Sequence, residues 1–239
     1  MSEINISIEG GTSKRLLTAG KYCDRDIVIT ATGGSSEPDN RALYQRVEYI
    51  TSDGASHVIT DFIADNSSGM ELVASFPTLV DRPPMGSRTD TGATRFYCVY
   101  PLSANSCYYG FNTGSTISTP LVANTVYRLQ TNFMNSRLVN IIDANGVRKG
   151  GTSISGTLAQ QNVPVAIFGY HHGGTNTISS LREYTLYSAR ISKGNDIVRE
   201  YIPCYRKADG VIGLYEKYTG AFLTNAGTGV FTKGADVDW

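Results

Sequence analysis

Residues 181–205 have the sequence LREYTLYSARISKGNDIVREYIPCY and carry the strongest secondary-structure signal in the chain. Apolar and polar residues alternate from Tyr187 to Ser192, the period of two expected when one face of a strand meets a core and the other meets water. The segment Lys193–Asp196 then supplies glycine and asparagine, which tolerate the left-handed backbone of a tight turn. We therefore predict a long β-hairpin, ended by Pro203, that needs a partner sheet to bury its apolar face.

The composition also favours short strands joined by frequent turns. The chain has 239 residues, of which 41% are hydrophobic and 18% charged, and it contains 25 glycines and 15 tyrosines. The Leu, Glu, Lys and Ala enrichment that is typical of helical proteins is missing. The formal net charge is zero, so we expect no nucleic-acid partner, and no run of about 18 apolar residues predicts membrane insertion.

Other β-rich segments follow the same pattern along the chain. Turn signals separate several of them, such as Asn145-Gly146 and the SDG sequence at 52–54. The predicted strands are 44–50, 57–62, 71–76, 95–100, 107–111, 125–133, 138–142, a segment from 147 onward, and 163–170. Short strands at this spacing, without a helical period, predict an all-β fold with two packed antiparallel sheets.

Residues 1–36 are predicted to form a separate small β element. Ile4–Ile8 alternates, Lys21–Ala31 is a second short strand, and Thr32–Asp39 has the Gly/Ser/Pro composition of a linker. We place the domain boundary there and expect 37–239 to fold without the element. So small an element leaves strand edges uncovered, so we expect it to attach to another protein or to form a homo-oligomer.

The start of the chain and its cysteines indicate the compartment. The first residues, MSE, begin no secretory signal, so synthesis in a cytosol is expected. The four cysteines lack the CxxC spacing of a zinc site, and a reducing compartment favours buried thiols; they are Cys23, Cys98, Cys107 and Cys204. Cys98 and Cys107 flank a predicted hairpin loop, which leaves a disulfide between them as the alternative.

Several of these segments resemble known families. The sequence LLTAGKYCDRDIVITA at Leu16–Ala31 resembles a short β element of tail and other virion proteins of phages and prophages. Tyr44–Ile50, the REYTLYSARI strand at Arg182–Ile191 and the end piece Ile202–Phe231 are similar to concanavalin A-like, laminin G-like jelly rolls. Similar endings occur in phage structural proteins, so the resemblance implies a jelly-roll sandwich preceded by a small N-terminal β element.

The same resemblance implies a virion protein that is made in the cytoplasm of a host. Its N-terminal element would bind other virion proteins, and likeness to phage fibres implies a homo-trimer. The jelly roll would be displayed for contact with a host surface or a glycan. A purely structural capsid or tail decoration protein without a ligand is the alternative.

Sequence motifs favour a protein that is not an enzyme. The glycosidases related to these jelly rolls use paired acidic residues on one strand as nucleophile and acid, which gives an ExDxxE pattern. No such pattern occurs in this sequence. Glu71 stands alone among apolar residues, and Asp24 and Asp26 belong to the small N-terminal element. The GxSxG, P-loop and HExxH patterns are absent. A polysaccharide depolymerase remains the enzymatic alternative.

The segment 169–176, GYHHGGTN, is the most suggestive polar constellation. Aromatic rings cover the apolar faces of a sugar while amide and hydroxyl groups bind its edges, and the alternative is an ordinary polar hairpin. A tyrosine pair at 108–109 is a second candidate platform, with a packing role as its alternative. We predict a ligand site on these loops and expect both histidines and the asparagine to be exposed; the candidates are Tyr108, Tyr109, Tyr170, His171, His172 and Asn176.

No metal or cofactor is predicted. Adjacent histidines point to opposite faces of a strand, so His171 and His172 should not hold one ion. Oxygen ligands for calcium exist on predicted loops, but no EF-hand-like spacing links them; they are Asp61, Asp65, Asp143 and Asn145.

Overall fold

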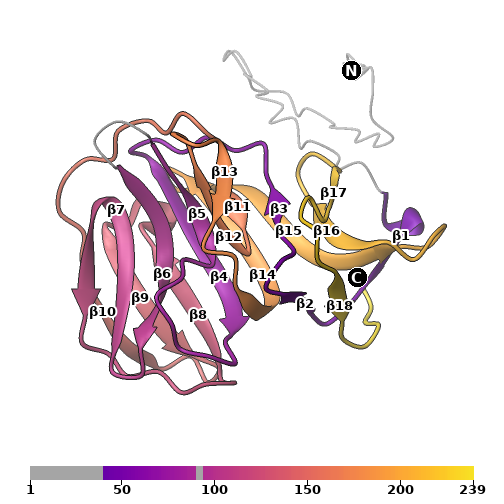
Figure 1. Cartoon of the computed structure of the whole chain (residues 1–239), viewed down its shortest axis with the longest axis horizontal. Helices are drawn as coiled ribbons and strands as arrows, with labels where there is room; N and C mark the ends of the chain where they lie inside the picture. Colours follow the sequence, from indigo (N-terminus) through magenta and orange to yellow (C-terminus); the bar gives the residue numbers. More distant parts are fainter. Residues whose placement is uncertain (1–39, 90–93) are drawn as a thin grey trace, which may run out of the picture. The chain divides into compact units, whose positions relative to one another are not determined.

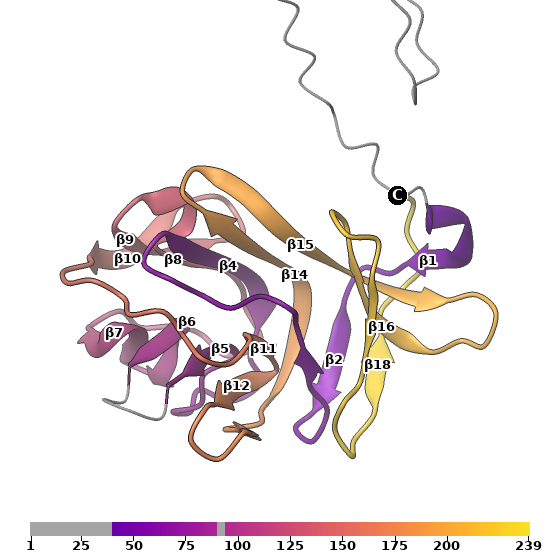
Figure 2. The same cartoon turned by 90° about the horizontal axis from the view of Figure 1, so that it is seen from above.

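A computed structural model describes residues 40–89 and 94–239, and it confirms the predicted all-β fold of two packed antiparallel sheets (Figure 1). Two short 3-10 helices, η1 (Asn40–Leu43) and η3 (Phe133–Asn135), accompany the strands. In Figure 2 the strands β9, β8 and β4 lie in one layer, and β7, β6 and β5 lie in the other. The N-terminal element and the predicted boundary lie outside the described residues.

The larger sheet has eleven strands. Its order is β10 (Arg148–Ser153), β9 (Leu138–Asp143), β8 (Val126–Thr131), β4 (Ser68–Ser75), β14 (Glu183–Lys193), β15 (Asp196–Arg206), β16 (Ile212–Glu216) and β17 (Phe222–Thr224). Beside this path, β1 (Tyr44–Arg46) pairs with β15, β2 (Ile50–Asp53) pairs with β14, and β18 (Phe231–Lys233) pairs with β2.

The smaller sheet has seven strands. Its order is β13 (Thr177–Ser179), β12 (Gly169–His172), β5 (Met85–Arg88), β11 (Ala166–Ile167) and β3 (Val58–Ile59), while β6 (Arg95–Ser103) pairs with β5 and β7 (Ser106–Ile117) pairs with β6. The pairs are antiparallel except β5 with β12, which is parallel.

The predicted hairpin is confirmed as β14 and β15, with Gly194 in the left-handed conformation at a φ of 60°. Its predicted end at Pro203 is wrong, because β15 continues to Arg206. The carbonyl of Pro203 accepts a hydrogen bond from the Val47 amide just beyond the end of β1, at 3.0 Å. At the end of that pairing no backbone donor is required of residue 203, so proline is tolerated.

The core lies between the two sheets, where alternate side chains of each strand meet. Full burial of each such side chain contributes about 1.5–3 kcal/mol. Buried residues from the larger sheet include Leu72, Leu129, Ile141, Ala189 and Ile191, and those from the smaller sheet include Phe96, Cys98, Phe111 and Ile167.

Two predicted strands are broken. Segment 44–50 forms β1 and then β2, with a bend between them. Segment 163–170 was expected to be one central strand, but it is interrupted at Phe168, whose φ is 72°. The Asn145-Gly146 turn is found where predicted, between β9 and β10, with a φ of 79° at Gly146.

The cysteine thiols at 98 and 107 are free and buried, so a disulfide between them is not formed. The Cys98 thiol donates to the Leu129 carbonyl at 3.4 Å, and the Cys107 thiol donates to the Thr119 carbonyl at 3.6 Å. Each sulfur thus has its own partner. In the described part of the chain, no helix has the length and apolarity needed to span a membrane.

Candidate functional site

The outer face of the smaller sheet carries two rows of aligned side chains across five strands. The first row, in register from β13 to β7, is Thr177, His172, Arg88, Arg95 and Asn112. The second row is Ser179, Tyr170, Gly86, Tyr97 and Gly110. Five of these residues and two further tyrosines define what we call the aromatic face: Tyr97, Tyr100, Tyr108, Tyr170, His172, Arg88 and Arg95. Within it the Tyr97 and Tyr100 side chains are buried.

A backbone kink at Phe168 places part of this face. A φ of 72° is strained for a bulky residue, and its fully buried ring holds it there by stacking on Tyr184 with a centroid distance of 4.4 Å. The Phe168 amide donates to the Pro84 carbonyl at 2.7 Å. Across this kink the chain changes from antiparallel pairing with β5 to parallel pairing. Tyr170 and His172 therefore lie on the outer face.

The aromatic rings lie close to one another. Tyr97 and Tyr170 have ring centroids 4.9 Å apart, and Tyr170 and His172 are 6.2 Å apart. Farther along β6 and β7, Tyr100 and Tyr108 are 5.8 Å apart. These distances are typical of favourable aromatic pairs. The rings form two groups, Tyr97 with Tyr170 and His172, and Tyr100 with Tyr108. Tyr108, Tyr170 and His172 are partly exposed, whereas Tyr97 and Tyr100 are only 4% and 2% exposed and support them from below.

Glycines on either side of Tyr97 make room for its ring. A Cβ on Gly86 would lie 2.8 Å from the ring, and a Cβ on Gly110 would lie 3.0 Å from it. Both distances are shorter than ordinary van der Waals contact, so a larger residue at either position would displace the ring.

Two tyrosine hydroxyls of the face stay protonated. Burial, and next the neighbouring Tyr170, raises the pKa of Tyr97 far above its ordinary value of 10.0. Burial likewise raises the pKa of Tyr100, and its hydroxyl donates to Asp81 at 2.8 Å, which raises the pKa further. Both groups are therefore hydrogen-bonding phenols at neutral pH.

Arg88 and Arg95 stand directly opposite each other on neighbouring strands of this face. Arg95 Nη1 donates to the Tyr108 hydroxyl at 3.4 Å, while the buried Nε of Arg88 has no hydrogen-bond partner. Within residues 40–89 and 94–239, neither guanidinium forms an ion pair with a carboxylate. Like charges directly opposite each other are unfavourable, and no carboxylate of the described residues pairs with these two.

Half of the predicted site residues come together on the aromatic face: Tyr108, Tyr170 and His172. His171 is only 6% exposed and Tyr109 only 7% exposed, because strand alternation turns both side chains inward. The predicted exposure of His171 is therefore wrong. Asn176 is exposed in the turn between β12 and β13, where its Oδ1 lies 3.0 Å from His171 Nε2.

Sequence reasoning missed four members of the face: Arg88, Arg95, Tyr97 and Tyr100. A signal was present in the sequence RFYCVY at 95–100, where Arg95 and Tyr97 alternate with the core residues Phe96 and Cys98. The approach of Arg88 to Arg95 depends on strand pairing between β5 and β6, which no local pattern reveals.

A separate polar ladder crosses the outer face of the larger sheet. Glu71 is buried there and is not isolated, because its oxygens meet Gln130 Nε2 at 2.7 Å and Arg190 Nη1 at 3.4 Å. Arg190 also binds Glu200, with Nη2 at 2.8 Å. A guanidinium thus connects the two carboxylates, and both acidic groups are occupied by protein partners.

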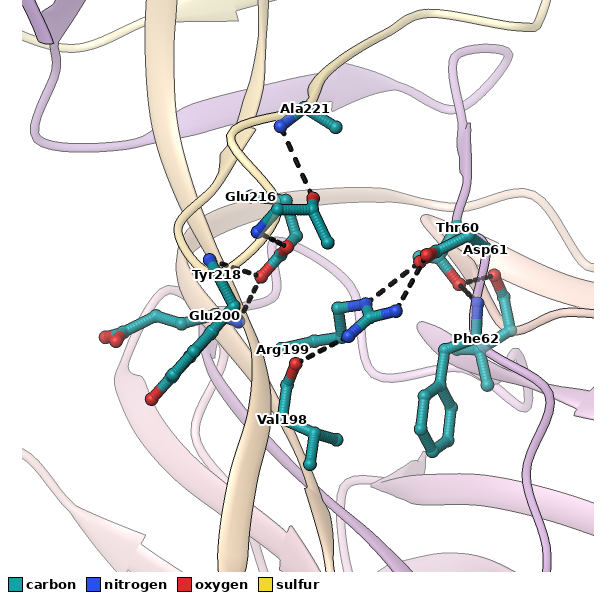
Figure 3. Close-up of polar contacts among 11 residues, drawn as sticks. Thr60, Asp61, Phe62, Val198, Arg199, Glu200, Glu216, Tyr218 and Ala221 are labelled. Atoms are coloured by element: carbon teal, nitrogen blue, oxygen red, sulfur yellow. Dashed lines mark hydrogen bonds and ion pairs between the residues drawn. The ribbon is translucent and has the colours of Figure 1, made fainter. Parts of the chain in front are cut away.

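Two further carboxylates support loops (Figure 3). Glu216, 1% exposed, accepts the backbone amides of Glu200, Tyr218 and Thr219 at 3.0, 3.1 and 2.7 Å. Asp61 accepts two hydrogen bonds from Arg199, at 3.0 and 2.7 Å, and these lower the pKa of Asp61. These interactions fasten neighbouring segments of the chain to one another.

The oxygens considered for calcium also have protein partners. Asp65 accepts hydrogen bonds from the Ser67 amide and hydroxyl, and Asp143 accepts the amides of Asn145 and Val147. In the part of the chain that the structure describes, no three His, Cys, Asp or Glu residues gather as metal ligands would.

No protein-family model and no curated protein matches the chain. Among solved structures, the chain is similar to a protein from Bacteroides ovatus ATCC 8483 described as a "putative carbohydrate binding protein", with a TM-score of 0.52 and 13% sequence identity. The similarity covers 81% of this chain and 62% of that chain, so this chain spans less than two thirds of that protein's length. At this level of identity the two share a β-sandwich fold.

Proposed function

We propose that the chain is a carbohydrate-binding β-sandwich that is not an enzyme, and that its aromatic face is the binding surface. The carrying observation is that three partly exposed rings, Tyr108, Tyr170 and His172, lie on one face of the smaller sheet beside Arg88 and Arg95. The buried rings of Tyr97 and Tyr100 support Tyr170 and Tyr108 at 4.9 and 5.8 Å. Rings cover the apolar faces of a pyranose, while phenol, imidazole and guanidinium groups hydrogen-bond its hydroxyls. The structural similarity to a protein of the described kind is consistent with this proposal.

The carboxylates favour binding over hydrolysis. A glycosidase needs one acidic residue as acid and another as base or nucleophile, each free to reach the sugar. Glu71, Glu200, Glu216 and Asp61 instead bind arginines or backbone amides of the protein. A polysaccharide depolymerase that used any of these four carboxylates would have to release these contacts first.

We further propose that the sandwich is displayed on a phage particle, with residues 1–36 attaching it to other virion proteins as a homo-trimer. This proposal rests on the resemblance of Leu16–Ala31 and Ile202–Phe231 to phage structural proteins. Immunogold electron microscopy of the parent particle, with antibody against 37–239, tests it. Gold labelling of the particle supports display, whereas purified particles without gold label contradict this proposal.

A glycan screen with two matched tyrosine variants tests the binding surface. Tyr170→Ala removes a central ring of the aromatic face, whereas Tyr187→Ala removes a half-buried ring that packs on Tyr49, at 5.6 Å. We expect Tyr170→Ala to weaken glycan affinity roughly tenfold, since the ring supplies stacking area. Tyr187→Ala should bind as the unmodified protein does.

Two outcomes would contradict the proposed surface. If a glycan ligand binds Tyr170→Ala and Tyr108→Ala with unchanged affinity, the site lies elsewhere. If the unmodified protein binds no glycan of the screen at about millimolar concentration, the purely structural decoration role replaces binding. A dissociation constant of about 1 mM corresponds to a binding free energy of only about −4 kcal/mol, so even weak binding would be detected.

A further inference from the structure

The aromatic face combines partly exposed aromatic rings with two positive charges that pair with no carboxylate of the described residues. Other arginines of the sandwich have defined protein acceptors. Arg190 pairs with Glu200 at 2.8 Å and Arg199 with Asp61 at 2.7 Å, whereas Arg82, Arg137 and Arg182 donate to backbone carbonyls. Arg88 and Arg95 differ because they face each other across β5 and β6 and form no ion pair among residues 40–89 and 94–239. Moreover, the Arg88 Nε is buried and lacks a hydrogen-bond partner.

Resting on the proposed function, we propose that the ligand is an acidic glycan whose carboxylate groups bind between Arg88 and Arg95. A guanidinium presents parallel N–H donors that match the two oxygens of a carboxylate. Such a ligand would supply a counter-charge that residues 40–89 and 94–239 do not provide to the two guanidinium groups. The sugar ring carrying the carboxylate would then stack on Tyr170, in the next row of the same sheet.

Neighbouring groups fit this assignment. His172 aligns with Arg88 on the next strand and adds a donor rather than an acid. The acidic group known at the edge of the face, Asp81, already accepts the hydroxyl of Tyr100 at 2.8 Å. A neutral sugar would add no counter-charge to the two guanidinium groups, which have none from residues 40–89 and 94–239, so charge complementarity favours an anionic ligand.

The test compares three classes of glycan on the full chain by isothermal titration calorimetry. The carboxylated probes are oligogalacturonate, oligoalginate and oligosialic acid, the sulfated probe is dextran sulfate, and the neutral probe is dextran. We expect a carboxylated probe to bind best. Its binding should weaken when salt rises from about 0.1 M to about 1 M, which shortens the Debye length from about 10 Å to about 3 Å.

Charge-matched variants locate the effect. Arg88→Gln/Arg95→Gln should weaken binding of the carboxylated probe by roughly tenfold or more for each arginine, because each loses a charge-assisted hydrogen bond. Arg128→Gln/Lys149→Gln removes the same charge from the larger sheet and should bind normally. Arg88→Lys/Arg95→Lys keeps the charge without the parallel donors and should bind with intermediate affinity. If a thermal melt shows that the double variant Arg88→Gln/Arg95→Gln does not fold, Arg88→Gln and Arg95→Gln are tested singly.

Failure of this inference is distinguishable from failure of the proposed function. If dextran binds as tightly as the carboxylated probes and the arginine variants bind normally, the acidic class is refuted while carbohydrate binding stands. If dextran sulfate binds best and the lysine variant keeps full affinity, a general cationic surface replaces the carboxylate site. If none of the probes binds, both proposals fall.

Discussion

Replacing Glu216 by glutamine should destabilise the sandwich strongly, although the two side chains have nearly the same shape. The Glu216 carboxylate accepts three backbone amides, among them those of Glu200 and Tyr218 (Figure 3). The shortest of these hydrogen bonds, from the Thr219 amide, is 2.7 Å. A glutamine can keep one oxygen as an acceptor, but its NH2 group then faces at least one backbone N–H. A hydrogen bond to a charged group is worth about 1.5–3 kcal/mol, and a buried donor left unpaired costs about 1–3 kcal/mol.

We therefore expect Glu216→Gln to lower the free energy of unfolding by about 3 kcal/mol. For a domain of about 200 residues this corresponds to a melting temperature about 6–12 °C lower. The single tryptophan of the sequence, Trp239, reports on this region, because its ring lies edge-on to Tyr215, one residue before Glu216, at 5.5 Å. Urea unfolding followed by tryptophan fluorescence gives the free energy directly.

Glu200→Gln is the matched control. Glu200 binds the side chains of Arg190 and Lys217, at 2.8 and 3.5 Å, at a partly exposed position. Such pairs contribute about 0–1 kcal/mol, so this variant should unfold within about 1 kcal/mol of the unmodified protein. If the two variants are equally stable, the three backbone amides are not the reason that the Glu216 carboxylate stabilises the fold.

Three other measurements test the described interior. Burial, and next the nearby His171, lowers the pKa of His57 below 6.5, so the folded protein favours the neutral imidazole. The melting temperature should therefore fall as the pH drops below about 6.5, and it should fall less in His57→Gln. An equal dependence of melting temperature on pH in the two proteins would contradict this. Burial alone would raise the pKa of Asp65, but hydrogen bonds from Ser67 and Lys193 outweigh burial and hold this pKa at about 2. The free energy of unfolding should therefore fall as the pH drops from about 4 towards 2, and Asp65→Asn should abolish this part of the loss. Burial raises the pKa of Cys107 and of Cys204 to about 12, so in Cys23→Ser a thiol reagent should label the protein only after denaturation, and labelling of the native protein would show that these thiols are not enclosed.

Local sequence patterns predicted the sheets well where alternation was regular. The β14–β15 hairpin followed from a period of two on each side of Gly194 and Asn195, because a buried and a wet face impose that period. The segment 163–170 was predicted as one strand because its left-handed residue is Phe168, and a bulky residue rarely adopts a positive φ. The left-handed backbone there is stabilised by the Tyr184 ring and the Pro84 carbonyl, which come from distant parts of the chain.

The candidate site was predicted only in part, for a related reason. Tyr108, Tyr170 and His172 were recognised by residue type, but the inward orientation of Tyr109 and His171 depends on which face of each strand meets the core. A one-residue change of phase reverses that assignment. Arg88 and Arg95 are seven residues apart in sequence, and their juxtaposition arises from strand pairing.

The outermost strand of the larger sheet, β10, has the sequence RKGGTS and pairs irregularly with β9, with a register shift between Arg148 and Gly150. Basic side chains, glycines and a bulge on a terminal strand discourage the backbone of a second molecule from adding to it. Concentrated preparations of the sandwich should therefore resist edge-to-edge aggregation and fibril growth along this border. Many copies could then be crowded onto one surface without their sheets fusing.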